Sequence, residues 1–221
     1  GEQLAGHDAA DPDTQPRARP PLLEVLAQEP PLPPLVGLVK GPLWERADPE
    51  TREAFEELAA ALGDRVEEVE LPGSADNALQ WQKTIMEAEM ALNLDVEWEK
   101  GRDRLSDSLR AQLARGREVS ALDYQKALAR IPVLNEAFDE IYARYDALLA
   151  PSAPGTAPQG TATGDPSFCS LWTLCGMPAL NLPLLRGGNG LPLGAQLVGP
   201  RGGDAQLLRT ARWLTGLAAA G

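Results

Sequence analysis

Few side chains in this 221-residue sequence could activate a nucleophile. Its single histidine, His7, lies in a proline-flanked stretch near the start of the chain. A general base must be held within hydrogen-bond reach of the group it deprotonates, and such a stretch offers little to hold it there. We therefore do not expect His7 to act as a base. A Ser-His-Asp triad is excluded unless His7 folds back onto the rest of the chain.

Lysine can replace histidine as the base when burial lowers its pKa. The sequence has four lysines, and none of them sits next to a serine in a glycine-rich turn: Lys40, Lys83, Lys100 and Lys126. Lys83 and Lys126 fall on predicted amphipathic helices, where a solvated lysine is the expected state. Lys40 ends a predicted strand just before Gly41-Pro42, a position that can face a cleft, but no partner residue supports a catalytic role.

Metal and phosphate sites are not indicated either. Cys169 and Cys175 are six residues apart in an apolar stretch, which matches no zinc or redox spacing, so we expect small buried side chains there. Only carboxylates then remain as metal ligands, and the acidic residues on one short strand are typical of a solvated edge: Glu67, Glu68 and Glu70. We predict no metal and no cofactor.

The segment from Thr163 to Pro183 is the remaining candidate for a site. It reads TGDPSFCSLWTLCGMPALNLP and combines a Gly-Asp-Pro turn, two aromatic residues, a short helix and an apolar strand. A carboxylate-bearing loop that leads into an aromatic-bearing helix can form the wall of a small-molecule pocket. Core packing explains the same residues equally well, so the residues alone leave both interpretations open.

The charge balance restricts the partners. Twenty basic residues stand against 32 acidic ones, a formal net charge of -12, and no cluster of lysine or arginine interrupts the acidity. Nucleic acid and anionic membranes are therefore not expected as partners. The sequence also has no apolar run of the roughly 20 residues that a membrane helix needs, and its start lacks the order of a signal peptide. We expect a cytoplasmic protein.

Two regions can be separated along the chain. Residues 1–34 contain eight prolines and form a predicted extended arm or linker. Residues 35–221 open with an apolar strand at 35–39, a helix that begins at Asp48-Pro49 and ends at Gly63, and a strand over Val66–Leu71. This strand-helix-strand order favours a parallel pair in a covered sheet.

The middle third is predicted to be helical and the last third mixed. Three amphipathic helices are expected, the first preceded by Ser74 and Asn77, the second carrying Leu105 to Leu113, and the third beginning at Ser120 with a kink at Pro132. A strand over 147–150, a loop to 166, a short helix over 168–175, a hairpin around Gly187–Gly190 and a terminal helix follow. The fold class is thus α/β, with a mixed sheet covered by helices.

Three blocks of this last third resemble the closing portion of amidase-signature enzymes. They are YDALLAPSAPGTAP at 145–158, TGDPSFCSLWTLCGMPALNLPL at 163–184 and GLPLGAQLVGPRGGDAQLLRTARWL at 190–214. Two earlier segments are similar to the family as well, LAGHDAADPDTQP at 4–16 and PLVGLVKGPLW at 34–44. The resemblance runs from about Leu4 to Leu217 and matches only the second half of the family's length.

This resemblance implies a reaction and an incomplete catalytic apparatus. Amidase-signature enzymes cleave carboxamides with a Ser-Ser-Lys triad and an oxyanion hole of backbone N–H groups in a glycine-rich loop, all in the first half of the family's length. No GGSSGG-like run occurs here and the seven serines are scattered, so no catalytic residue is transferred. We expect this chain to be inactive alone and to need the missing N-terminal half, or self-association. The alternative is a noncatalytic binding or scaffold domain derived from the same fold.

The resemblance also suggests where an amide substrate would bind. In the glutamine-using amidotransferase members of the family, an arginine on the kinked third helix holds the substrate carboxylate. The nearest match here is Ile131, with Arg130 one step away and on another face, which favours a less polar amide, as in general amidases. The substrate-binding residues predicted on this basis are Ile131, Asp165, Phe168, Cys169 and Trp172.

Overall fold

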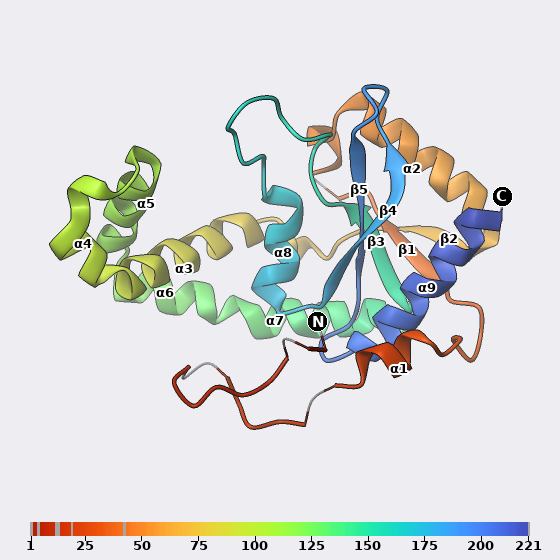
Figure 1. Ribbon diagram of the computed structural model, residues 1–221, viewed down its shortest axis with the longest axis horizontal. Coiled ribbons are helices and arrows are strands. Elements are labelled where there is room, and N and C mark those ends of the chain that lie inside the picture. The colour runs from red at the N-terminus through yellow and green to blue at the C-terminus, as the bar shows by residue number, and fades with distance from the viewer. Residues whose placement is uncertain (1, 4, 12–13, 19, 42, 221) are drawn as a thin grey trace.

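A mixed sheet forms the centre of the molecule. The computed structural model describes residues 2–3, 5–11, 14–18, 20–41 and 43–220, and within these residues five strands pair in the order β2-β1-β3-β5-β4 (Figure 1). The strands are β1 (Val36–Val39), β2 (Val66–Val69), β3 (Ala147–Pro151), β4 (Ala179–Arg186) and β5 (Pro192–Val198). The predicted mixed sheet is therefore confirmed.

The strand directions follow from the connections. Strand β1 runs parallel to both β2 and β3, and helix α2 (Pro49–Leu62) makes the crossover from β1 to β2. Strand β5 runs antiparallel to β3 and to β4, the latter through the predicted hairpin. Strand β2 ends at Val69 and not at the predicted Leu71, because its partner β1 ends opposite it at Val39.

Helices cover the two faces of the sheet. Helices α2 and α9 (Asp204–Ala220) lie on one face, where Phe55, Leu197 and Leu214 are fully buried. Helices α7 (Arg130–Tyr142) and α8 (Ser167–Cys175) lie on the other, around Phe138 and Leu148 (Figure 1). Adjacent residues of β3 enter opposite cores, which explains why this strand is apolar at almost every position.

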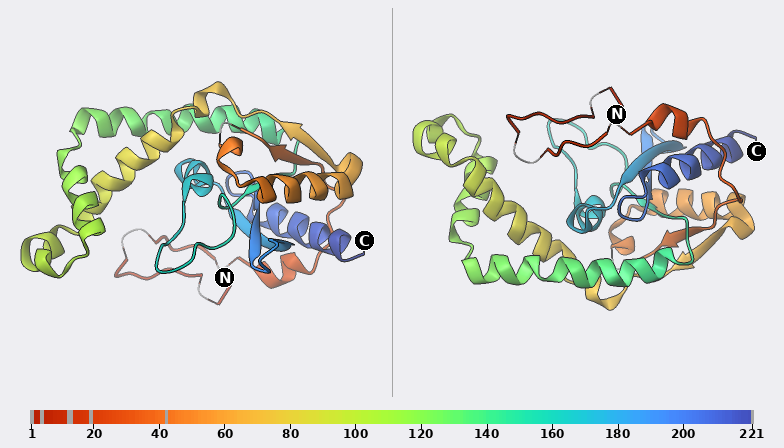
Figure 2. Two further views of the ribbon diagram at one scale, coloured as in Figure 1. Left: turned by 90° about the horizontal axis from the view of Figure 1, so that it is seen from above. Right: turned by 90° about the horizontal axis from the view of Figure 1, so that it is seen from below.

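A helical protrusion extends away from the sheet. It consists of the outer part of α3 (Ala78–Asn93) together with α4 (Asp95–Gly101), α5 (Asp107–Glu118) and α6 (Ala121–Leu128), as Figure 2 shows from two sides. Helices α5 and α6 begin as capped helices, with the Ser106 and Ser120 hydroxyl oxygens accepting N–H bonds three residues on. The described residues also form four single turns of 3-10 helix: Trp44–Arg46, Gly63–Arg65, Gly73–Ala75 and Arg102–Arg104.

The predicted kink at Pro132 is a break between two helices. Helix α6 ends at Leu128 and α7 begins at Arg130, so Pro132 falls in the first turn of the new helix. Proline is tolerated there because the N–H groups of the first turn have no partner within the helix. The element was thus predicted as one bent helix, whereas the chain forms two.

The first 34 residues are attached to the domain at their end. The described part of this arm contains one short helix, α1 (Leu22–Leu26), which was not predicted. Arg212 on α9 donates to the Leu26 carbonyl over 2.8 Å and pairs with Glu29 over 3.4 Å. The domain boundary at residue 34 stays a prediction, and the sequence interpretations that fall on Leu4, Pro12 and Pro42 lie outside the described residues.

Candidate functional site

Helix α8 carries or adjoins four of the five predicted site residues, and Asp165 fixes where this helix begins. The Asp165 carboxylate accepts the Ser167 N–H over 2.9 Å and an Arg46 guanidinium N–H over 2.7 Å. Burial alone would raise its pKa, but the hydrogen bonding of Ser167 and the charge of Arg46 outweigh burial, so the pKa of Asp165 lies below its usual value. Asp165 is therefore an ionised, already partnered carboxylate.

The two aromatic residues of α8 face inward. Phe168 and Trp172 are buried, and the Trp172 ring meets the Phe138 ring edge-on with the centroids 5.7 Å apart. Phe168, Trp172 and Trp44 line a cavity of about 30 Å³, which is room for one water. The Trp172 Nε1–H has no hydrogen-bond partner among the described residues. In this conformation the aromatic residues pack the core and leave no space for a substrate group.

Cys169 lies between α8 and the sheet. Its sulfur lies 3.2 Å from the Ser152 carbonyl oxygen and 3.4 Å from Gln196 Oε1, and the Gln196 amide donates to the Phe168 carbonyl over 3.3 Å. Burial raises the pKa of the Cys169 thiol and raises that of Cys175 to about 12. Neither thiol ionises at neutral pH, so neither is an activated nucleophile. Cys175 is buried as expected, while Cys169 is only partly buried.

Asp165 faces a groove of about 570 Å³ between the loop after β3 and the strands β4 and β5. The groove also contains the side chains of Asp48, Ser152 and Asn181. A Cβ atom at Gly194 would lie 1.8 Å from Ser152 Oγ, so the Ser152 side chain keeps this position only beside a glycine. Helix α2 begins after Asp48 as predicted, but the Asp48 side chain makes no cap bond, and the Asp48 N–H donates to the Pro154 carbonyl over 2.8 Å.

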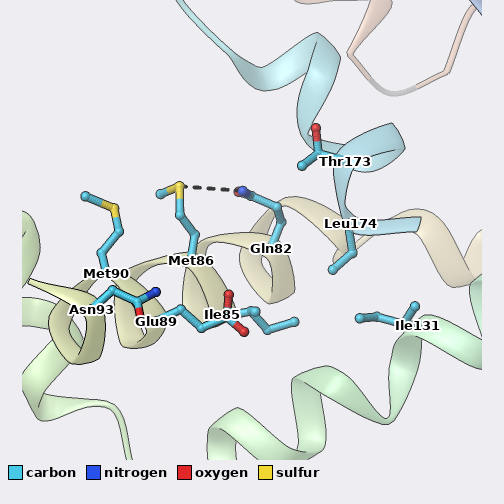
Figure 3. Close-up of a pocket in the computed structure, with 9 residues that line it drawn as sticks. All are labelled: Gln82, Ile85, Met86, Glu89, Met90, Asn93, Ile131, Thr173 and Leu174. Atoms are coloured by element: carbon cyan, nitrogen blue, oxygen red, sulfur yellow. Dashed lines mark hydrogen bonds between the residues drawn. The ribbon is translucent and has the colours of Figure 1, made fainter. Parts of the chain in front are cut away.

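Ile131 lies in a different pocket, formed by α3, α7 and α8 and about 330 Å³ in volume (Figure 3). Figure 3 shows the Ile85 and Ile131 side chains pointing toward one another across the gap between α3 and α7. Arg130 turns elsewhere, with its guanidinium 5.7 Å from the centre of the Trp81 ring. The pocket is lined by Gln82, Ile85, Met86, Glu89, Met90, Asn93, Ile131, Thr173 and Leu174.

The five predicted residues therefore do not meet in one cavity. Asp165 lines the groove, Phe168 and Trp172 line the small cavity, and Ile131 lines the pocket of Figure 3. Several lining residues were missed by the sequence interpretation. Met86 and Met90 lie on the first of the three predicted amphipathic helices, and helical spacing alone does not distinguish a core from a pocket. Glu89 lies between them in the sequence and gave no signal of its own.

Two other candidate bases, His7 and Lys40, already have partners. His7 Nδ1 lies 3.1 Å from Thr14 Oγ1, but both residues are exposed and Thr14 Oγ1 also lies 2.9 Å from the Asp8 carbonyl oxygen. Lys40 pairs with Glu68 over 3.2 Å and lies over the Trp44 ring. In the part of the chain that the structure describes, no group of three or more metal-ligating side chains is assembled, and none of the helices combines the length and the apolar composition of a membrane span.

Comparison with known proteins identifies the family. A family model described as Amidase matches residues 2–208. The chain belongs to the amidase family. Among its curated relatives, a glutamyl-tRNA(Gln) amidotransferase component from Lachnospira eligens is 42% identical over 84 residues, which cover 34% of this chain and 18% of that protein. The equivalent amidotransferase component from Desulforamulus reducens is 28% identical over 211 residues, 80% of this chain and 43% of that protein.

Solved amidase structures share the fold. A crystal structure described as an amidase is 26% identical, with a TM-score of 0.75 over 86% of this chain and 47% of that one. A bacterial aryl acylamidase of the amidase signature family is 19% identical, with a TM-score of 0.75 over 98% and 49%. At that identity the second match shows the fold alone. The chain spans about half the length of these structures, and the predicted α/β amidase-type fold is confirmed.

Proposed function

We propose that this chain is part of a hydrolase that cleaves the C–N bond of carboxamides and releases ammonia or an amine. In this proposal the chain contributes half of the sheet and the walls of the substrate pocket, while the serine nucleophile and the lysine base belong to residues outside it. The observation that carries the proposal is the amidase match over residues 2–208, because it includes α3, α7 and α8 and the pocket between them.

The pocket around Ile131 supports a substrate that is apolar along most of this wall and carries no carboxylate there. Ile85, Ile131 and Leu174 give it apolar walls, and no arginine or lysine is among its described lining residues. A glutamine-type substrate would leave its carboxylate without a cationic partner there, and burying an unpaired charge is costly. The relatives from Lachnospira eligens and Desulforamulus reducens are named as subunits of a glutamyl-tRNA(Gln) amidotransferase. The proposed preference of this chain for a less polar amide therefore depends on the apolar side chain of Ile131.

An uncovered part of the sheet supports the need for a further segment. In β4 the residues alternate, with Leu182 buried against the α9 side and Ala179, Asn181 and Pro183 exposed on the α8 side. Within the described residues β4 pairs only with β5. A covering segment from an N-terminal half, or a second copy of the chain, would shield this surface.

One observation favours the noncatalytic alternative. Asp165, the carboxylate expected in the pocket wall, accepts hydrogen bonds from Arg46 and from the Ser167 N–H at the start of α8. These contacts stabilise the fold and need no substrate. A binding or scaffold domain would retain such contacts without any reaction. The two proposals differ in what happens when the missing catalytic residues are supplied.

The test is a complementation assay. The chain is purified alone and also co-expressed with the N-terminal half of a related amidase, and ammonia release from octanamide and benzamide is measured. We expect no release by the chain alone and measurable release by the pair, abolished when the nucleophilic serine of the added half is changed to alanine. Turnover by the chain alone would contradict the proposal. A stable but inactive pair would favour the scaffold alternative.

A further inference from the structure

The pocket between α3, α7 and α8 is apolar on most sides and charged at one point. Its volume of about 330 Å³ is at the lower end of the range for small-molecule sites, which suits a short alkyl chain or one ring. Ile85, Ile131 and Leu174 supply rigid branched walls, and Met86 and Met90 supply flexible side chains that adapt to different shapes (Figure 3). Six of the lining residues follow α3 from Gln82 to Asn93, so the pocket extends along this helix and favours an elongated apolar group.

Glu89 is the charged residue among the described lining residues of this pocket. The Tyr124 hydroxyl on α6 donates to one of its carboxylate oxygens over 2.9 Å. A carboxylate has about four acceptor positions, so this bond leaves acceptor capacity for a ligand. Glu89 is also exposed, so its carboxylate can remain charged beside an apolar surface.

Three arginines on the surrounding helices already have partners. Arg115 on α5 is held by Glu87, with Nε and Nη2 at 2.9 and 2.6 Å from one carboxylate oxygen. Arg117 pairs with Asp95 and Glu99. Arg130 on α7 lies over Trp81. None of them is among the pocket's lining residues, so the charge of Glu89 is not neutralised by a lining cation.

We propose that this pocket takes an elongated apolar group that ends in a positively charged nitrogen, and that Glu89 is the residue that selects this end over a carboxylate. The inference rests on the proposed function, in that the group is the part of an amide substrate remote from the scissile bond. The apolar walls bind the chain of the ligand, and the carboxylate attracts a terminal ammonium and repels a terminal carboxylate.

Three probes of matched length separate these effects. They are 7-aminoheptanamide with a cationic end, octanamide with a methyl end, and 6-carbamoylhexanoate with an anionic end. Binding is followed on the intact chain by the NMR signals of methyl-labelled methionine, because the sequence holds only three methionines. Met86 and Met90 line the pocket, and Met177 lies in the sheet core as an internal control.

We expect Met86 and Met90 to shift with all three probes, and the cationic probe to bind about fivefold more tightly than the anionic one. A ratio of this size is expected because the solvent-exposed Glu89 carboxylate weakly attracts the cationic probe and weakly repels the anionic one. The Glu89→Gln variant keeps an acceptor for Tyr124 and should bring the ratio to about one, leaving octanamide unchanged. The Glu97→Gln variant makes the same charge change on α4, outside the pocket lining, and should leave the ratio intact.

An Ile131→Arg variant should invert the preference toward the anionic probe, since it places a cation among the lining residues. Equal binding of the two charged probes by the unmodified chain would overturn the inference, as would a loss of the ratio in Glu97→Gln. If none of the three probes shifted the NMR signals of Met86 and Met90, the pocket would not be a binding site for such ligands. Octanamide turnover in the complementation assay would in that case leave the proposed function standing, so the two failures are distinguishable.

Discussion

At the scale of single residues, the difference between the expected and the observed roles of Asp165 is informative. The Gly-Asp-Pro turn suggested that the Asp165 carboxylate is open to a ligand. The position of Asp165 just before α8 could be predicted from the sequence. Its partner Arg46 is 119 residues earlier in the chain, and no local pattern encodes such a contact. The same limit applies to Ile131, whose neighbours in the pocket come from two other helices.

Replacement of Asp165 should separate its two contacts. Asp165→Asn keeps an acceptor for the Ser167 N–H but loses the charge that pairs with Arg46, and this pair is partly exposed. We expect a loss of under about 1 kcal/mol in the free energy of unfolding at neutral pH. Asp165→Ala also removes the acceptor of the Ser167 N–H just before α8 and should cost about 1 kcal/mol more. Urea unfolding of the two variants beside the unmodified chain measures both values.

The pKa of Asp165 fixes the pH dependence of that loss. Because the folded-state pKa is lowered, the charged form stabilises the fold above the ordinary aspartate pKa of about 3.9, and this stabilisation disappears as pH falls through the folded-state value. The difference between the unmodified chain and Asp165→Asn should therefore be full at pH 7 and shrink below about pH 4. A difference that stays constant down to pH 3 would show that the charge is not responsible.

At the scale of elements, periodicity and turn residues predicted most of the fold. Strands β1, β3 and the β4–β5 hairpin, and helices α2, α8 and α9, occur where apolar spacing and glycine turns indicated them. Helix α1 was missed because prolines dominate its surroundings, yet proline just before a first turn is compatible with a helix. The long helix from Ser120 was not recognised as two, because proline position alone does not show where a helix ends.

The packing of α3 against α5 depends on a glycine that periodicity does not identify. A Cβ at Gly116 would lie 1.9 Å from the Glu87 carbonyl oxygen, a backbone atom that cannot swing aside. Gly116→Ala should therefore destabilise the chain by roughly 1–3 kcal/mol through overpacking, although alanine favours helices. Gly216 on α9 is the matched control, since nothing lies within 4 Å of its added Cβ.

The control should change stability in the opposite direction. Gly216→Ala relieves the entropic cost of a helical glycine and is expected to stabilise by up to about 1 kcal/mol. Thermal unfolding of both variants, followed by circular dichroism, compares them directly. If Gly116→Ala were as stable as Gly216→Ala, the close approach of α3 and α5 would not exist in solution.

At the scale of the whole molecule, the edges of the sheet determine how the chain can associate. Strand β2 is short and carries Glu67 and Glu68, and Pro183 lies at a register shift in β4. Charges, short length, proline and irregular pairing all oppose indiscriminate edge-to-edge pairing of strands. The surface that remains is the exposed side of β4.

We expect this surface to be covered in solution. At micromolar concentration, light scattering should report a mass above the 23.6 kDa of one chain, and addition of an amidase N-terminal half should convert the assembly to a one-to-one complex. Ala179→Lys adds a charge on the exposed side of β4 and should reduce self-association. Gln159→Lys, at an exposed position in the loop after β3, is the control and should have no effect. A monodisperse monomer of the unmodified chain would contradict the expectation, because the uncovered strand would then be stable in water.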